Sequence, residues 1–345
     1  MNFAQVPMRN VGPIKIIGDI MNEEIMVPLA TYEVPVWPST NRGAKVSREC
    51  GGILATLIDE RMARSVAFSA PNASVANSIV RQIIERKTEL QKVVAETSRF
   101  AELLDIHYQI IANNLYIRFE FLTGDASGHN MVTKASDHLM KFLLKEYTDL
   151  SYISVSGNVC TDKKVSAVNG LLGRGKNVVT EMTISRDICQ KILKTTPEKI
   201  VELNTKKNLL GSIAAGSLRS ANAHFANVLL AFYLATGQDA ANIVEGSQGF
   251  TFAECRGDSL YFSTTLPNII VGTVGNGKEL DFVNENMELM NCREDRPAGE
   301  NARRLAVICA SAVMCCELSL LAALTNPGEL MRAHVAFERA KLKVE

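Results

Sequence analysis

The chain has 345 residues and a mass of 37.7 kDa, a length typical of about two domains. Hydrophobic residues make up 47% and charged residues 21% of the sequence, which excludes a disordered, collagen-like or coiled-coil chain. Its 37 basic and 37 acidic residues cancel, so the sequence lacks the positive excess of nucleic-acid-binding proteins and we expect no nucleic-acid partner.

The N-terminal part contains a predicted strand over about 13–18, a loop over 32–42 and a helix over roughly 45–62. Its first residues do not have the basic start and apolar stretch of a secretory signal. Eight cysteines are scattered along the chain without a CxxC pair, mostly among apolar residues, which is typical of reduced thiols. We therefore expect a cytoplasmic protein.

A compact block of predicted elements follows. Apolar residues at spacings of three and four predict its helices, and alternating apolar residues predict its strands. An asparagine pair between two alternating runs predicts a hairpin. The elements are a strand at 64–70, a helix from Asn72, strands near 106–110 and 115–119, a helix over about 130–146 and a strand at 151–155. The order β-α-β-β-α-β is typical of a ferredoxin-like unit.

Because this block lies inside the chain, the residues on both sides of it must form the other domain. We predict an α+β fold in which a large mixed α/β domain (1–64 and 156–345) carries an inserted ferredoxin-like domain (65–155). Chain crossings of this kind commonly border a binding cleft.

The remaining elements follow the block. They are predicted as a strand at 178–185, helices near 186–195, 197–209 and 220–236, and strands at about 249–255, 258–265 and 268–272. Residues 305–324 are apolar and numerous enough to cross a bilayer, which takes about 20 residues. Glu317 within this run would be costly in lipid, so we predict a core helix over 302–324 and no membrane association. A last helix opens at Asn326-Pro327.

Glycine-rich segments raise the question of nucleotide binding. Residues 170–177 (GLLGRGKN) almost fit a phosphate-binding loop, but Asn177 stands where the motif needs a hydroxyl, so we reject an ATPase. Residues 272–277 (GTVGNG) allow a ligand to approach the backbone closely, although an ordinary turn has the same composition. The sequence contains no GxGxxG dinucleotide motif, no HExxH and no zinc-finger spacing, and we expect no metal.

A charged segment, Asp162-Lys163-Lys164, follows a strand end at the predicted crossing between the domains. A lysine beside another cation and a carboxylate can stabilise a developing oxyanion. A solvated charge cluster has the same composition, so this segment by itself does not identify a reaction.

Eight segments stand in a characteristic order and spacing: residues 28–46, 98–100, 114–119, 124–131 (GDASGHNM), 156–176, 207–242, 272–278 and 317–339. Together they resemble the 3-hydroxy-3-methylglutaryl-coenzyme A reductase family, and the chain is similar to the soluble catalytic part of its NADPH-dependent form. The resemblance implies that the large domain binds the coenzyme A thioester and that the inserted domain binds NADP(H). It also implies a homodimer, or a dimer of dimers, with shared active sites.

The reaction implied by the resemblance is the reduction of 3-hydroxy-3-methylglutaryl-coenzyme A (HMG-CoA) to mevalonate by two NADPH, with release of coenzyme A. Lys163 matches the lysine that stabilises the carbonyl oxyanion, and Glu33 matches the glutamate that donates a proton. Asp239 matches the active-site aspartate. His334 matches the histidine that protonates the departing thiolate.

Further matches imply binding roles. The substrate-binding positions are Arg42, Arg64, Ser156, Asp162, Lys164, Lys207 and Asn227. The cofactor-binding positions are Ser98, Arg99, Asp125, Asn130, Gly272 and Gly275. Ser98 and Arg99 match the pair that receives the 2′-phosphate, which favours NADPH over NADH.

Two alternatives stay open at this point. The same fold could oxidise mevalonate with NAD+, and the cofactor preference would separate the two directions. A non-catalytic relative could bind an acyl-coenzyme A or a nucleotide without turnover. That reading predicts the loss of at least one of the four catalytic residues, and all four are present.

Overall fold

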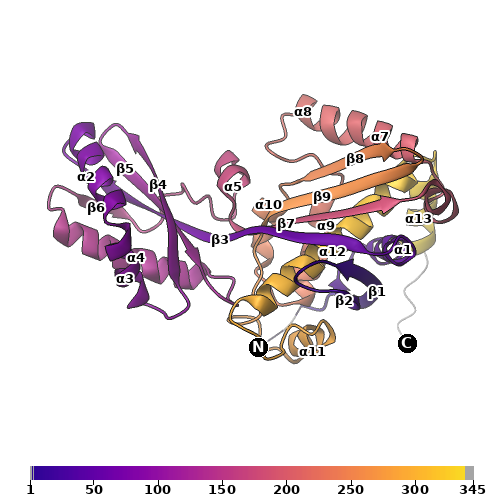
Figure 1. Ribbon diagram of the computed structural model, residues 1–345, viewed down its shortest axis with the longest axis horizontal. Helices are drawn as coiled ribbons and strands as arrows, with labels where there is room; N and C mark the ends of the chain where they lie inside the picture. The colour runs from indigo at the N-terminus through magenta and orange to yellow at the C-terminus, as the bar shows by residue number, and fades with distance from the viewer. Residues whose placement is uncertain (1, 3, 339–345) are drawn as a thin grey trace.

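The computed structural model describes residues 2 and 4–338 of the chain (Figure 1). Two lobes lie side by side, and the long strand β3 (Ile53–Ser69) runs from one into the other (Figure 1). Helices and strands both contribute to each lobe, which confirms the predicted α+β class.

The larger lobe is built on a sheet with the strand order β2-β1-β3-β7-β9-β8. Strand β1 runs parallel to the start of β3, and every other neighbouring pair along this order is antiparallel. The strands other than β3 are β1 (Met8–Ile17), β2 (Glu23–Ala30), β7 (Gly175–Ile184), β8 (Phe250–Arg256) and β9 (Ser259–Ile269).

The apolar helix α12 (Glu300–Leu324) forms the centre of the larger lobe. It contacts α1 (Val36–Glu49), α9 (Phe225–Ala235) and the sheet. Although α12 is long and apolar enough to cross a membrane, 94% of its most apolar window is buried inside the molecule. Its apolar composition is therefore that of a core helix.

Short helices cover the rest of the larger lobe. They are α5 (Ala167–Leu172), α6 (Arg186–Ile188), η1 (Cys189–Leu193), α7 (Pro197–Leu203), η2 (Asn204–Gly211), α8 (Ser212–Ala214), η3 (Ala240–Asn242), α10 (Ile243–Gly246), α11 (Asp281–Leu289) and α13 (Glu329–Glu338). Of these, η1 and η2 are π-helical, with one extra residue in each turn of hydrogen bonds.

The smaller lobe is an antiparallel sheet covered by three helices. Its order is β4-β5-β3-β6, with β4 (Glu102–Ile111), β5 (Asn114–Leu122) and β6 (Ser151–Ser154). The helices α2 (Ala73–Glu85), α3 (Lys87–Ala95) and α4 (His129–Glu146) share with the sheet a hydrophobic cluster separate from that of the larger lobe. The observed elements follow the predicted β-α-β-β-α-β order, with α3 added.

One predicted helix is wrong. The sequence predicted a helix over 45–62, but α1 covers 36–49 and β3 begins at Ile53. Gly51 and Gly52 have φ values of 98° and 127°, and this left-handed backbone ends the helix. Because α1 starts at Val36, much of the predicted loop over 32–42 is also helical.

Two predicted strands, at 258–265 and 268–272, are one continuous strand, β9. Pro267 lies inside it, where the pairing with β7 shifts register between Lys176 and Val178. A proline donates no backbone hydrogen bond, and such an irregularity accommodates it without ending the strand.

Candidate functional site

Two cavities contain most of the predicted site residues. The first, of about 400 Å³, lies among α1, α9, α12 and α13; we call it the helix cavity. Glu33, Arg42, Asn227 and His334 line it. The second, of about 370 Å³, lies where the chain crosses between the lobes; we call it the crossing cavity. It is lined by Arg64, Asn130, Asp162, Lys163, Asp239 and Gly275.

The predicted catalytic residues are thus divided between the two cavities of one chain. Lys163 and Asp239 share the crossing cavity, whereas Glu33 and His334 line the helix cavity. Among the described residues, none lines both cavities.

Lys163 and Asp239 form the charged centre of the crossing cavity. The ammonium Nζ of Lys163 lies 2.6 Å from Oδ2 of Asp239. The other carboxylate oxygen of Asp239 accepts the backbone N–H of Ala241 at 3.1 Å, at the start of η3. Burial alone would raise the pKa of Asp239, but the hydrogen bonds from Lys163 and Ala241 outweigh it and lower the pKa. The carboxylate is therefore ionised beside the ammonium.

The loop that carries Lys163 has a strained backbone. Asn158, Thr161 and Lys163 have φ values of 61°, 43° and 57°, a region that residues other than glycine rarely adopt. Arg174 supports this loop, because its guanidinium contacts Asp162 at 3.0 Å and the buried Glu245 at 2.7 Å. These contacts place the lysine side chain over the cavity.

His129, at the start of α4, is a further group in the crossing cavity. Its Nε2 lies 3.8 Å from Oδ1 of Asp162. Burial, and then the charge of Arg174, lower the pKa of His129 to about 4, so the imidazole is neutral at pH 7. Nε2 of His129 and Nε of Arg64 are buried without a hydrogen-bond partner among the described residues. Both atoms therefore have unused hydrogen-bonding capacity in side chains that line this cavity.

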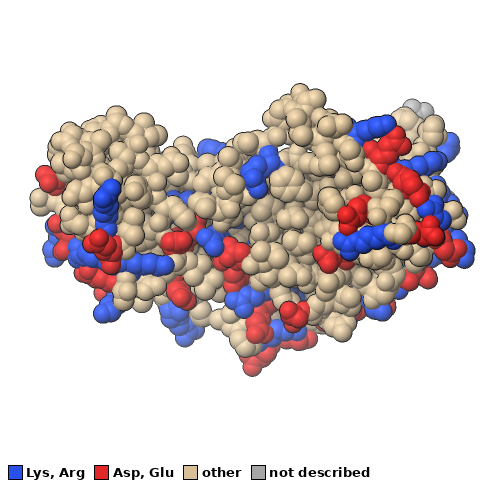
Figure 2. Space-filling model, turned by 45° about the horizontal axis from the view of Figure 1, so that its top comes forward, with Lys and Arg blue, Asp and Glu red and all other residues tan. Residues whose placement is uncertain are grey.

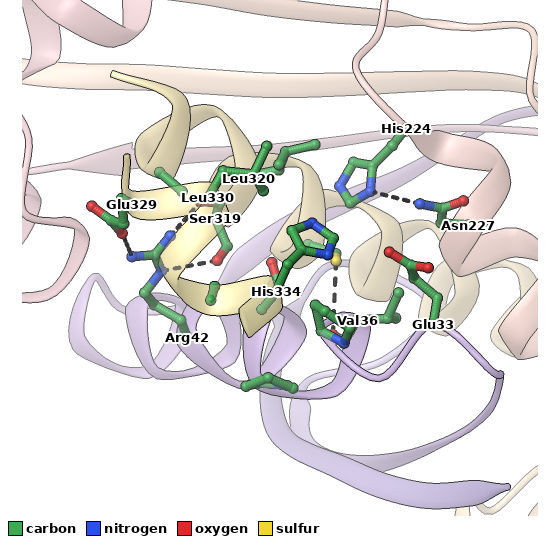
Figure 3. A pocket seen from close by; sticks show the side chains of 16 residues that line it. Glu33, Val36, Arg42, His224, Asn227, Ser319, Leu320, Glu329, Leu330 and His334 are labelled. Atoms are coloured by element: carbon green, nitrogen blue, oxygen red, sulfur yellow. Dashed lines mark hydrogen bonds and ion pairs between the residues drawn. The ribbon is translucent and has the colours of Figure 1, made fainter. Parts of the chain in front are cut away.

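The helix cavity brings together side chains from four segments. Figure 3 shows Glu33, His224 and Asn227 at one end, Arg42 and Glu329 at the other, and His334 between them. The backbone N–H of Glu33 donates to Oγ1 of Thr31 at 2.9 Å, which fixes the turn ahead of α1. Nδ2 of Asn227 lies 3.4 Å from Nδ1 of His224 (Figure 3).

Glu317 explains why α12 contains a charged residue. Its carboxylate is fully buried and accepts the backbone N–H groups of Ala223 at 2.7 Å and His224 at 3.1 Å. The hydroxyl of Thr251 donates to it at 2.8 Å. Burial opposes protonation of His224, but the neighbouring Cys316 and Glu317 outweigh it and raise its pKa to about 9. The hydrogen bonds of Glu317 thus fix the start of α9 beside the helix cavity.

Seven predicted site residues line neither cavity: Ser98, Arg99, Asp125, Ser156, Lys164, Lys207 and Gly272. The carboxylate of Asp125 accepts the N–H groups of Gly299 and Ala302, both at 2.9 Å, and so caps the start of α12. Gly272 permits a close approach, since a Cβ there would lie 2.3 Å from the backbone nitrogen of Ser127. Arg99 is exposed, with its guanidinium 4.6 Å from the ring centre of Phe100.

Some residues in or beside the two cavities were not predicted as site residues from the sequence. They include His224, Glu329 and Cys316 in the helix cavity and the Arg174–Glu245 pair beside the crossing cavity. A sequence signal existed only for their neighbour Glu317, a lone carboxylate in an apolar run. The others have no local pattern, because they become neighbours only when distant helices pack.

A cluster of Asp105, His107 and Glu120 has potential metal ligands within 4.8 Å of one another. However, the carboxylate of Glu120 already contacts Arg61 at 2.5 Å and Arg118 at 2.8 Å. Two adjacent guanidinium groups disfavour a bound cation, so we assign this cluster to an ion-pair network.

Comparison with known proteins gives a consistent result. The family model described as hydroxymethylglutaryl-coenzyme A reductase matches residues 2–339. The 3-hydroxy-3-methylglutaryl-coenzyme A reductase of Pyrococcus horikoshii is 46% identical over 337 residues, which cover 97% of this chain and 81% of that protein. The protein of the same name from Aeropyrum pernix is 44% identical over 343 residues, 99% of this chain and 81% of that one.

Solved structures share the fold. A class II 3-hydroxy-3-methylglutaryl-CoA reductase from Streptococcus pneumoniae, bound to NADPH in open conformations, superposes with a TM-score of 0.75. The match covers 94% of this chain and 86% of that one, at 21% sequence identity. At this identity the likeness concerns the fold alone.

Proposed function

This chain belongs to the hydroxymethylglutaryl-coenzyme A reductase family, and from that premise we propose that it reduces HMG-CoA to mevalonate with two NADPH and releases coenzyme A. The observation that carries the proposal is the Lys163–Asp239 pair, 2.6 Å apart in a cavity between the lobes. An ammonium group held beside a carboxylate is suited to stabilise the oxyanion that forms when a carbonyl is reduced.

The residues of the crossing cavity have separate roles in this reduction. Lys163 stabilises the carbonyl oxygen as negative charge develops on it. Asp239 orients the lysine through their ion pair and stays ionised. Arg64 and Asp162, 3.6 Å apart, hold the polar end of the acyl group, and Ser156, Lys164 and Lys207 are further substrate contacts in this proposal.

Residues of the helix cavity donate the protons that the reaction needs. Glu33 donates a proton to the reduced oxygen, and His334 protonates the thiolate of coenzyme A as it leaves. Asn227 bonds to His224 and borders the same cavity, and Arg42 contacts coenzyme A.

The residues near the crossing cavity fit NADPH. Nε2 of His129 and Nε of Arg64 have no hydrogen-bond partner among the described residues and belong to side chains that line this cavity, and Arg99, exposed outside the cavity, offers a cation to a phosphate. When bound, NADPH supplies a hydride for each of the two reductions. We propose residues 65–155 as the NADP(H)-binding domain, with Ser98, Arg99, Asp125 and Asn130 as its binding positions, and Gly272 and Gly275 of the large domain as further cofactor contacts.

We further propose that the active sites form between two copies of the chain. The division of the catalytic residues between separate cavities supports this, since one copy could bring Glu33 and His334 to the Lys163–Asp239 pair of the other. Exposed apolar side chains offer a contact surface: Leu171, Leu210, Ile213 and Leu218. The face that carries α5 and α8 comes forward in Figure 2 and has a broad area with few charged side chains.

We propose a cytoplasmic location for the enzyme. All eight cysteines lie in the described residues and have free thiols, which suits a reducing compartment. Acidic and basic side chains are mixed on the surface shown in Figure 2, without a large area of one sign.

NADPH consumption by the purified chain with HMG-CoA tests the function, and NADH is assayed in parallel. Lys163→Ala should lower kcat by at least about 100-fold because the oxyanion loses its counter-charge, while thioester binding stays measurable. A matched control is Lys141→Ala, since Lys141 is an exposed lysine paired with Asp137. Near-normal turnover of Lys163→Ala would refute the assigned role, and NAD+-dependent oxidation of mevalonate alone would establish the reverse reaction.

A further inference from the structure

All three nitrogens of the Arg42 guanidinium group contact other parts of the chain. Its Nε donates to Oγ of Ser319 at 2.9 Å, and its Nη2 donates to the carbonyl oxygen of Ser319 at 2.5 Å. Its Nη1 lies 2.8 Å from Oε1 of Glu329 (Figure 3). Ser319 belongs to α12 and Glu329 to α13, so one arginine of α1 connects three helices.

Of these partners, Glu329 belongs to the helix that is least firmly packed. It begins α13, directly after Gly328, whose φ of 77° marks a sharp change of direction. Its second oxygen, Oε2, accepts a hydrogen bond from Asn326 at 3.0 Å. Further along α13, Met331 is 64% and Val335 47% exposed, so few apolar contacts hold this helix. Polar contacts around Glu329 therefore account for much of its attachment.

The charges in the helix cavity make this contact significant for a phosphate ligand. Among the described residues that line the cavity, Arg42 is the one lysine or arginine. Glu33 and Glu329 are the acids there. A phosphate group that enters the cavity meets two cations there, Arg42 and His224, whose pKa is raised to about 9, and a carboxylate already pairs with Arg42.

We propose that Glu329 is an affinity-determining residue: its carboxylate occupies the place on Arg42 that a phosphate oxygen of coenzyme A takes. The inference rests on the proposed function, which assigns coenzyme A to this cavity. Binding of coenzyme A then breaks the Arg42–Glu329 ion pair and brings a phosphate near a carboxylate. Because Glu329 and His334 lie on the same helix, this exchange also releases the first turn of the helix that carries the histidine.

The test compares Glu329→Gln with the wild type in direct binding measurements by calorimetry. The probes are coenzyme A, adenosine 3′,5′-bisphosphate, which carries phosphates without the pantetheine arm, and pantetheine, which lacks phosphates. Removal of the competing charge should tighten the first two about 3- to 10-fold and leave pantetheine unchanged. The affinity of the variant should also fall more steeply with salt, since the arginine then faces the phosphate without an internal counter-charge.

A matched control is Glu198→Gln, because Glu198 pairs with Arg186 away from either cavity. It should leave all three affinities unchanged. Equal or weaker binding of coenzyme A by Glu329→Gln would overturn the inference, as would equal tightening of pantetheine. If the wild type binds coenzyme A normally in that case, the proposed function is untouched. Failure of the wild type to bind coenzyme A at all would instead count against the proposed function.

Discussion

His129 illustrates how burial and a neighbouring charge change the chemistry of one residue. Its imidazole lies in the crossing cavity beside Asp162, and that carboxylate favours the charged form. Burial and the charge of Arg174 are stronger, so the pKa falls to about 4. A neutral ring next to Lys163 and Asp239 can donate or accept a hydrogen bond without adding charge to the site.

The lowered pKa of His129 predicts how stability depends on pH. Below pH 6.5, the ordinary pKa of the imidazole, His129 binds a proton in the unfolded chain. In the folded chain it stays neutral until the pH falls to about 4. This contribution to the free energy of unfolding is complete above pH 6.5 and is lost as the pH falls toward 4. In urea titrations at pH values across this interval, the free energy of unfolding of His129→Gln should fall by about 2 kcal/mol less than that of the wild type. Parallel curves for the two proteins would show that burial does not set this pKa.

Glu317 shows a residue whose role could be half predicted. A carboxylate in an apolar run predicted a core helix, and 94% of the most apolar window of α12 is buried inside the molecule. Its partners, the N–H groups at the start of α9 and Thr251, could not be predicted. They lie on segments far apart in the sequence, and only packing brings their donors to one acceptor.

At the scale of whole elements, the contact between α1 and α12 depends on one glycine. A Cβ on Gly43 would lie 2.1 Å from the backbone oxygen of Cys315. The clash is with main-chain atoms, so it can be relieved only by moving one helix away from the other. This contact positions Arg42, the preceding residue, against Ser319. The close approach of the two helices therefore supports the geometry of the helix cavity.

Gly43→Ala should lower the free energy of unfolding by about 2–3 kcal/mol, because the added methyl group must push the two helices apart. Thermal and urea unfolding measure the effect. Gly211→Ala serves as the control, since its Cβ would meet only an ordinary contact at 3.6 Å, and it should be close to neutral. An equally small effect of both substitutions would mean that the helices can separate freely.

Elements with local signals were predicted well. Asn72 accepts the N–H of Val75 as the expected N-cap of α2, and β4 and β5 form the expected hairpin, whose turn, Ala112-Asn113, lies one residue before the asparagine pair. The first half of β3 was missed and taken as helix. Burial alternates from Ile53 to Ile58, but the exposed positions Leu54 and Ile58 are apolar, so the sequence does not show the apolar–polar alternation that marks a strand.

At the scale of the molecule, β3 is shared by the two sheets. It pairs with β1 and β7 in the larger lobe and with β5 and β6 in the smaller one. Each lobe has its own hydrophobic cluster, and the crossing cavity lies where the chain passes between them. A shared strand couples the two lobes covalently and leaves a cavity lined by both.

A mixing experiment tests the proposed sharing of active sites between copies. Lys163→Ala and His334→Ala are each expected to be inactive, but a mixed dimer would contain one site with Lys163 from one copy and His334 from the other. Co-refolded in equal amounts, the two variants should recover about one quarter of wild-type activity, because half of the dimers are mixed and each has one intact site. A mixture as inactive as its components would contradict shared sites.

The sequence by itself determined the class of fold, the family and the identity of the charged residues, since these depend on local periodicity and on residues in a fixed order. Only the tertiary structure decided their grouping. Lys163 meets Asp239 in one cavity, whereas Glu33 and His334 line another, and Asp125 caps a helix. The physical reason is that these contacts join segments up to hundreds of residues apart, and their geometry follows from how helices and strands pack, which no local pattern encodes.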